Sequence, residues 1–114
     1  MRRFVGLFLT LWMLAAVPTA APAASVEEEL GPELMAIADE IAAKLIYGVR
    51  FEGLKGERVP AVARAWGDYY IRQGLINKRQ ASMMQIYASR AATLYQQGVP
   101  HVTYAERMAA EKRR

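Results

Sequence analysis

In the stretch PELMAIADEIAAKLIYGV, residues 32–49, apolar side chains recur at the spacing of one helix face. Leu34, Ile37, Ile41 and Leu45 follow one another at intervals of three, four and four residues, which is the period of an amphipathic α-helix. Pro32 suits the first turn of a helix, so we predict a helix over 32–48. Ala38 and Val49 extend its apolar face, and the charged residues are expected away from that face: Glu33, Asp39, Glu40 and Lys44.

A second helix is predicted over 60–73, starting at Pro60 and stopping before Gly74. The face expected to be buried consists of Val62, Ala65, Trp66, Tyr69 and Gln73. The connection before it, residues 47–60, contains three glycines and is predicted to be a loop. A loop of this length needs anchors, and Phe51 and Leu54 are the side chains expected to pack into the domain.

A third helix is predicted over 78–97 and a short fourth helix over 104–112. The third begins at a capping box, Asn77 to Gln80, and ends at Gly98. The fourth begins at the capping box Thr103 to Glu106. The buried stripe of the third helix is expected to consist of Ala81, Met84, Ala88, Ala91 and Tyr95.

These patterns predict an all-α fold, a small bundle of three main helices plus a short C-terminal helix. The links between the helices are short enough for antiparallel neighbours. No internal repeat is evident. We therefore expect one helical domain over 24–114, whose largest core side chains are Trp66, Tyr69 and Tyr70.

The N-terminus has the three-part layout of a secretory signal peptide. Arg2 and Arg3 precede an uncharged apolar run over 4–17, and small residues follow with a best cleavage point after Ala23. The alternative is an uncleaved anchor. The run would span roughly 21 Å as a helix, which is short of the ~30 Å hydrocarbon core of a bilayer. Cleavage of residues 1–23 and a periplasmic or secreted location are therefore predicted.

The predicted cleavage would change the net charge of the chain. The full chain of 114 residues carries a formal charge of +4, and residues 24–114 carry +2. Residues 24–52 carry −5 and residues 53–114 carry +7, so the two halves either neutralise each other or steer a charged partner. Export disfavours nucleic acid as a partner. The absence of cysteine excludes disulfides and thiolate chemistry.

Candidate catalytic or metal-binding sets are absent from the sequence pattern. His101 is the only histidine, and no serine stands at a spacing that would pair with it. It is interpreted as a loop or cap residue. Glu27, Glu28 and Glu29 are adjacent on a helix and diverge around its axis, so they are interpreted as helix-start charges rather than a calcium site. We expect no enzyme activity, no cofactor and no metal.

The candidate partner-binding residues are apolar side chains off the predicted buried faces: Ile46, Tyr47, Ile71 and Ile86. Burial within a four-helix packing is the alternative for each. The first functional hypothesis is a non-enzymatic exported protein that binds another envelope or secreted protein, or a second copy of itself. Inhibitors, immunity factors, chaperones and assembly accessories belong to this class. The second hypothesis is a binder of an apolar small ligand or a membrane surface, although membrane contact is not required.

Overall fold

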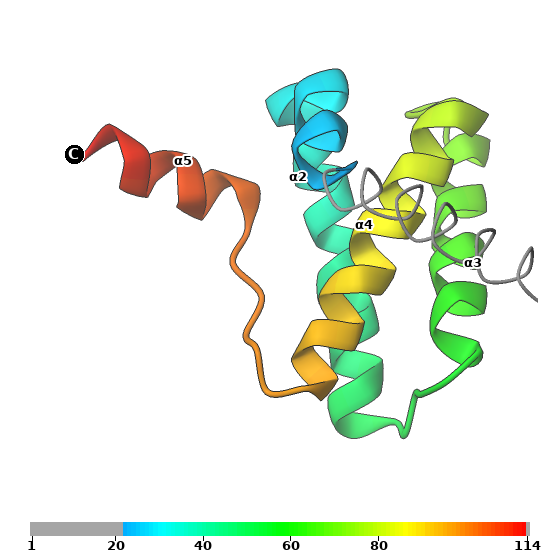
Figure 1. Ribbon diagram of the computed structural model, residues 1–114. Helices are drawn as coiled ribbons and strands as arrows, with labels where there is room; N and C mark the ends of the chain where they lie inside the picture. The colour runs from blue at the N-terminus through cyan, green and yellow to red at the C-terminus, as the bar shows by residue number, and fades with distance from the viewer. Residues whose placement is uncertain (1–21, 114) are drawn as a thin grey trace, which may run out of the picture.

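The computed structural model describes residues 22–113, and these form four helices (Figure 1). They are α2 (Pro22–Phe51), α3 (Arg58–Arg72), α4 (Lys78–Gln96) and α5 (Tyr104–Lys112). No strand occurs in this range, so the predicted all-α fold with three long helices and one short helix is confirmed. The predicted signal segment, residues 1–23, lies outside the described residues except for its last two.

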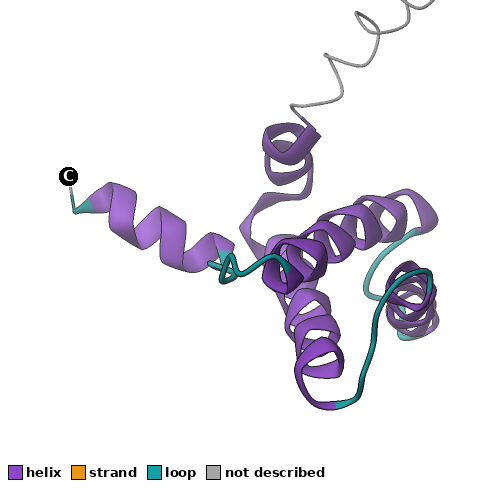
Figure 2. Cartoon of the chain, turned by 60° about the horizontal axis from the view of Figure 1, so that its bottom comes forward, coloured by secondary structure: helices purple, strands orange, loops and turns teal. Residues whose placement is uncertain are grey.

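Helix α2 consists of two arms that meet at Gly31. This residue has φ 79° and ψ 170°, a conformation that a residue with a side chain rarely adopts. Pro32 follows and starts the second arm, because its missing N–H needs no partner there. Figure 2 shows the short first arm bent away from the axis of the long one. Val26 and Leu30 of the first arm are buried, so this arm still contributes to the core.

The core forms where α4 packs against both α2 and α3. Its largest fully buried side chains are Met35, Ile41 and Leu45 of α2 and Met84 of α4. Buried alanines on the facing sides of these helices let the backbones approach closely. They are Ala38 and Ala42 on α2, and Ala81, Ala88, Ala91 and Ala92 on α4.

The buried face of α3 differs from the predicted one. Val59, Ala63, Gly67 and Tyr70 are buried, whereas Ala65, Tyr69 and Gln73 are exposed. The helix is turned because its small residues face α4. A Cβ atom at Gly67 would lie 2.7 Å from the side-chain nitrogen of Gln85 and 3.4 Å from the Cβ of Ala81. Close helix packing through small residues therefore outweighs burial of the larger apolar set.

Three of the predicted helix ends are confirmed in detail. The side chain of Asn77 accepts from the backbone of Gln80, and Thr103 and Glu106 form the same reciprocal box. Gly98 has φ 92° and donates to the carbonyl of Tyr95, while Val99 donates to Leu94. These two bonds satisfy carbonyl groups that the end of α4 would otherwise leave free.

The loop between α2 and α3 has one apolar anchor instead of two. Leu54 is buried and packs beside Gly48, where a Cβ atom would lie 2.9 Å from the Cδ2 atom of Leu54. Phe51 is 64% exposed, so its predicted burial is wrong. Phe51 is the last residue of α2, and its ring lies beside Tyr47 on the outer face of the helix.

Helix α5 contacts α2 and projects from the side of the bundle (Figures 1 and 2). The segment over 97–103 leaves the end of α4 and returns along the bundle, and α5 then packs on α2. None of its residues is buried. A helix of nine residues is marginal by itself in water, so its position depends on the contacts at its start.

The core assignment predicts a contrast between two isoleucines. Ile41→Ala removes a fully buried side chain and should lower the free energy of unfolding by about 2–5 kcal/mol. Ile86→Ala removes a side chain that is 58% exposed and should change it by about 0.5 kcal/mol or less. Urea denaturation followed by circular dichroism measures both, and equal losses would contradict the assigned core.

Candidate functional site

The four predicted partner-binding residues differ in their exposure. Tyr47 is 52% exposed and Ile86 is 58% exposed. Ile46 is half-buried. Ile71 is half-buried and packs against the core, so its expected position off the buried face is wrong. The rotation of α3 described above brings Ile71 inward.

Tyr47 borders a groove between α2 and α3, which we call the aromatic groove. Its apolar lining consists of Ala43, Tyr47, Leu54, Val62 and Trp66, and its volume is about 450 Å³. The ring of Tyr47 meets Phe51 edge to face at 4.9 Å between centroids. Trp66 meets Tyr69 in the same way at 5.6 Å. Two aromatic pairs therefore stand on the two helices that border the groove.

Charged residues of both signs line the aromatic groove: Glu40, Lys44, Glu52 and Arg58. The ammonium of Lys44 lies 4.7 Å from the ring centroid of Trp66, a cation–π contact that holds the indole in place. The hydroxyl of Tyr70 donates to Glu40. Burial and the adjacent Glu40 carboxylate raise the pKa of Tyr70, so this hydroxyl keeps its proton and remains a donor.

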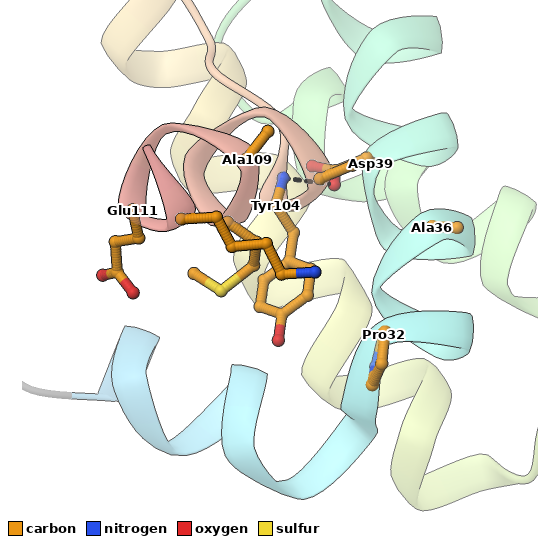
Figure 3. Close-up of a pocket in the computed structure, with 9 residues that line it drawn as sticks. Pro32, Ala36, Asp39, Tyr104, Ala109 and Glu111 are labelled. Atoms are coloured by element: carbon orange, nitrogen blue, oxygen red, sulfur yellow. Dashed lines mark hydrogen bonds between the residues drawn. The ribbon is translucent and has the colours of Figure 1, made fainter. Parts of the chain in front are cut away.

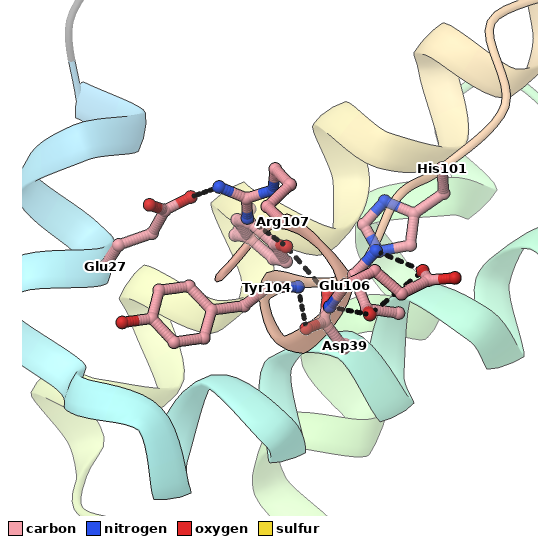
Figure 4. Close-up of polar contacts among 8 residues, drawn as sticks. Glu27, Asp39, His101, Tyr104, Glu106 and Arg107 are labelled. Carbon is pink, nitrogen blue, oxygen red and sulfur yellow. Dashed lines mark hydrogen bonds and ion pairs between the residues drawn. The ribbon is translucent and has the colours of Figure 1, made fainter. Parts of the chain in front are cut away.

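A second cluster is centred on the carboxylate of Asp39 (Figure 4). One oxygen of Asp39 accepts from the hydroxyl of Tyr87 at 2.7 Å and lies 2.8 Å from Nε2 of His101. The other accepts from the backbone N–H of Tyr104 at 2.8 Å. Asp39 is only 8% exposed. The prediction that it lies away from the buried face of its helix is therefore wrong. His101 does lie in a loop, as predicted, and its ring is half-buried against Asp39.

The electrostatics of this cluster favour an ionised Asp39. Burial raises the pKa of the carboxyl group, but the hydrogen bonds from His101, Tyr87 and the Tyr104 backbone outweigh it, and the pKa lies below its ordinary value. Burial and the bond to Asp39 raise the pKa of Tyr87. An ionised carboxylate accepts, so Nε2 of His101 carries the hydrogen that faces it.

The cluster continues to the first arm of α2 through Arg107 of α5. The guanidinium of Arg107 lies 2.5 Å from the carboxylate of Glu27 and donates to the hydroxyl of Tyr87 at 3.4 Å. Both arms of α2, α4 and α5 are thereby connected through polar side chains. Within the described residues no buried side-chain nitrogen or oxygen lacks a partner, so this polar interior is fully satisfied.

A pocket of about 700 Å³ lies between α2 and α5, with Asp39 at its inner end (Figure 3). Pro32 and Ala36 line it on α2, and Tyr104, Met108 and Ala109 line it on α5. Its lining is mostly small and apolar. Asp39 uses both oxygens in the bonds described above, so the polar groups that remain for a ligand are the charged ends of the exposed residues Glu111 and Lys112.

Residues 22–113 present no cluster of metal ligands and no helix of membrane-spanning character. No group of three or more histidine, aspartate or glutamate side chains is placed to hold a metal ion there. Of the helices in that range, none combines the length and the apolar character needed to cross a bilayer. The geometry in this part of the chain thus offers grooves and a satisfied polar cluster.

The sequence contains a weak signal for the burial of Asp39, which the pattern of apolar residues alone does not predict. Met35, Asp39 and Ala42 follow one another at intervals of four and three residues, which places Asp39 on the same helix face as two fully buried side chains. Trp66, which the sequence pattern places in the core, is half-buried and borders the aromatic groove.

Comparison with known proteins yields no match: no protein family, curated protein or solved structure is significantly similar to this chain.

The Asp39 cluster predicts a loss of stability in Asp39→Asn. The amide replaces one acceptor by a donor that faces His101 or the Tyr104 N–H, and the free energy of unfolding should fall by about 1–3 kcal/mol at neutral pH. Asp68→Asn, at an exposed position of α3, is the matched control and should have little effect.

The same pair of variants tests the sign of the pH dependence. Folding lowers the pKa of the Asp39 carboxyl group. The ionised carboxylate therefore stabilises the fold at pH values above its ordinary pKa of about 3.9, and this stabilisation is lost as the pH falls through the pKa of the folded state. Wild type and Asp68→Asn should therefore lose more stability on acidification than Asp39→Asn, measured by urea denaturation between neutral and acid pH. Parallel pH profiles for all three would contradict this assignment.

Proposed function

We propose that this chain is exported after removal of residues 1–23 and acts without catalysis, by binding another envelope or secreted protein through the aromatic groove. The sequence pattern of residues 1–23 supports export. Cleavage after Ala23 removes only the first two residues of α2 and none of the side-chain contacts described above.

The observation that carries this proposal is the composition of the aromatic groove. Tyr47, Trp66 and Arg58 surround it, and tyrosine, tryptophan and arginine are the side chains enriched where binding energy concentrates at protein interfaces. Tyr47 is half exposed although it belongs to a well-packed helix. The lining charges of both signs match a partner segment that presents an apolar anchor between polar residues.

The Asp39 cluster supports a non-catalytic role. Both carboxylate oxygens are occupied by donors of the fold itself, and the carboxylate joins α2 to α5. Its geometry is that of a structural connection between helices.

A membrane surface is the second candidate, favoured by Phe51. This side chain is 64% exposed at the end of α2, and the guanidinium of Arg50 lies 4.9 Å from its ring centroid. Lys55 follows in the exposed loop. An exposed aromatic residue with bases nearby is typical of contacts with anionic headgroups, although the acidic Glu52 directly follows Phe51 in this loop.

The groove is tested by a paired substitution and a site-specific cross-link. A photoreactive residue in place of Tyr47 should join the chain to one discrete partner in its own cells, and the same residue at Ile86 should not. Ala43→Arg fills the groove and should then reduce the affinity for that purified partner by about 30-fold, the loss expected at an interface hot spot. Ala65→Arg, at an exposed alanine on α3, should leave the affinity unchanged.

Three results would contradict this proposal. They are equal cross-linking from both positions, unchanged affinity in Ala43→Arg, and co-sedimentation with anionic vesicles that is lost on Phe51→Ser with no protein adduct. The last result would favour the membrane candidate.

The proposed export has a separate test. The intact mass of the protein isolated from its own cells should correspond to residues 24–114. Recovery of the full-length chain from the cytoplasm would contradict export. The cross-linking and affinity measurements at the groove would not be affected by that result.

A further inference from the structure

A second pocket, of about 300 Å³, is lined by His101 and shares no lining residue with the α2/α5 pocket. Its apolar wall comes from Leu94, Val99 and Val102. Its polar side comes from Arg90, His101 and Arg107. The volume is at the lower end of the range for small-molecule sites, and a mostly apolar lining with a few polar groups is typical of them.

The charge of this pocket favours an anion. Glu27 is its acidic lining residue and already pairs with Arg107. Arg90 is exposed, and no carboxylate in the described part of the chain forms an ion pair with it. The pocket therefore has one guanidinium in excess. The carbonyl of Leu94, at the nearby end of α4, accepts a hydrogen bond from the N–H of Val99. Because this carbonyl is already paired, it repels an incoming anion less than a free carbonyl would.

His101 presents its second ring nitrogen away from the Asp39 cluster. Nε2 is engaged by Asp39, and Figure 4 shows the other nitrogen turned away from that carboxylate. Since no buried side-chain nitrogen is left without a partner among the described residues, and no hydrogen bond joins Nδ1 to any of them, Nδ1 is accessible, and His101 is one of the residues that line the pocket. His101 thus forms part of the pocket wall, and the donors for a ligand come from the two arginines.

From this arrangement we infer that the pocket binds a small aliphatic monocarboxylate. Arg90 receives the carboxylate, with Arg107 held by Glu27 as the second guanidinium. Leu94, Val99 and Val102 cover the hydrocarbon chain. A planar guanidinium suits a carboxylate because two parallel N–H groups match its two oxygens. This site is separate from the aromatic groove, so the inference goes beyond the proposed function.

Hexanoate is the probe, and His101 is the reporter. Because the chain has a single histidine, the ring C–H resonances of His101 can be followed by NMR in the full chain without ambiguity. Hexanoate should shift them in a saturable manner. The neutral 1-hexanol and the cationic hexylamine have similar chain lengths and should bind at least about tenfold more weakly.

Two kinds of variation separate the polar and apolar contacts. Arg90→Gln should weaken hexanoate binding by about tenfold or more, whereas Arg72→Gln, at an exposed position on α3, should not change it. Because Arg90 is exposed, its replacement leaves the fold intact, which circular dichroism verifies. From butanoate to hexanoate, affinity should rise about threefold to fourfold per methylene group.

The inference is overturned by any of three results. The first is the absence of a saturable hexanoate-dependent shift of His101. The second is equal binding of hexanoate and hexanol. The third is equal weakening by Arg90→Gln and Arg72→Gln, which shows general charge attraction to the surface.

Discussion

The carboxylate of Asp39 is the point at which α2, α4, the 97–103 segment and α5 meet. It accepts from Tyr87 of α4 and from the backbone at the start of α5, and it pairs with His101 between them. A buried charge is costly unless its partners are present. The position of α5, which has no fully buried residue, therefore depends on this anchor, on the Arg107–Glu27 pair beside it and on Tyr104, which packs against the core.

The polar cluster also separates the surfaces that can hold another molecule. Asp39 lines the α2/α5 pocket, whereas Tyr87, His101 and Arg107 line the pocket with Arg90, and the two pockets share no lining residue. The aromatic groove between α2 and α3 lies apart from both, since its lining contains no residue of α5 or of the 97–103 segment. A protein partner at the groove and a small anion at the second pocket could therefore bind without competing for the same side chains.

Much of the fold follows from short-range patterns. The spacing of Ile41 and Leu45, the stripe containing Met84, and the caps at Asn77, Thr103 and Gly98 are local properties, and the structure agrees with them. The face of α3 could not be predicted in this way. Its rotation depends on how closely Gly67 approaches Ala81 and Gln85 of α4, and such a fit between helices has no signature within one helix.

The candidate site was less predictable for a related reason. The exposure of Tyr47 is predictable because an aromatic residue off a helix face is visible locally. The pattern of α3 instead places its neighbour Trp66, across the groove, in the core. Asp39 looked like a solvated charge because its partner His101 is 62 residues away in the sequence. The periodicity of one helix can show that a position is on a buried face, but it cannot show which polar group from another segment will meet it there.

The dependence of α5 on Asp39 is tested most directly by amide hydrogen exchange in wild type and Asp39→Asn, read out by peptide mass spectrometry. The substitution should accelerate exchange in 101–112 far more than in the middle of α3 and α4, because α5 loses its anchor while the three-helix core remains. Unchanged exchange in 101–112, or an equal acceleration in all helices, would contradict the account of Asp39 as the specific connection between α5 and the bundle.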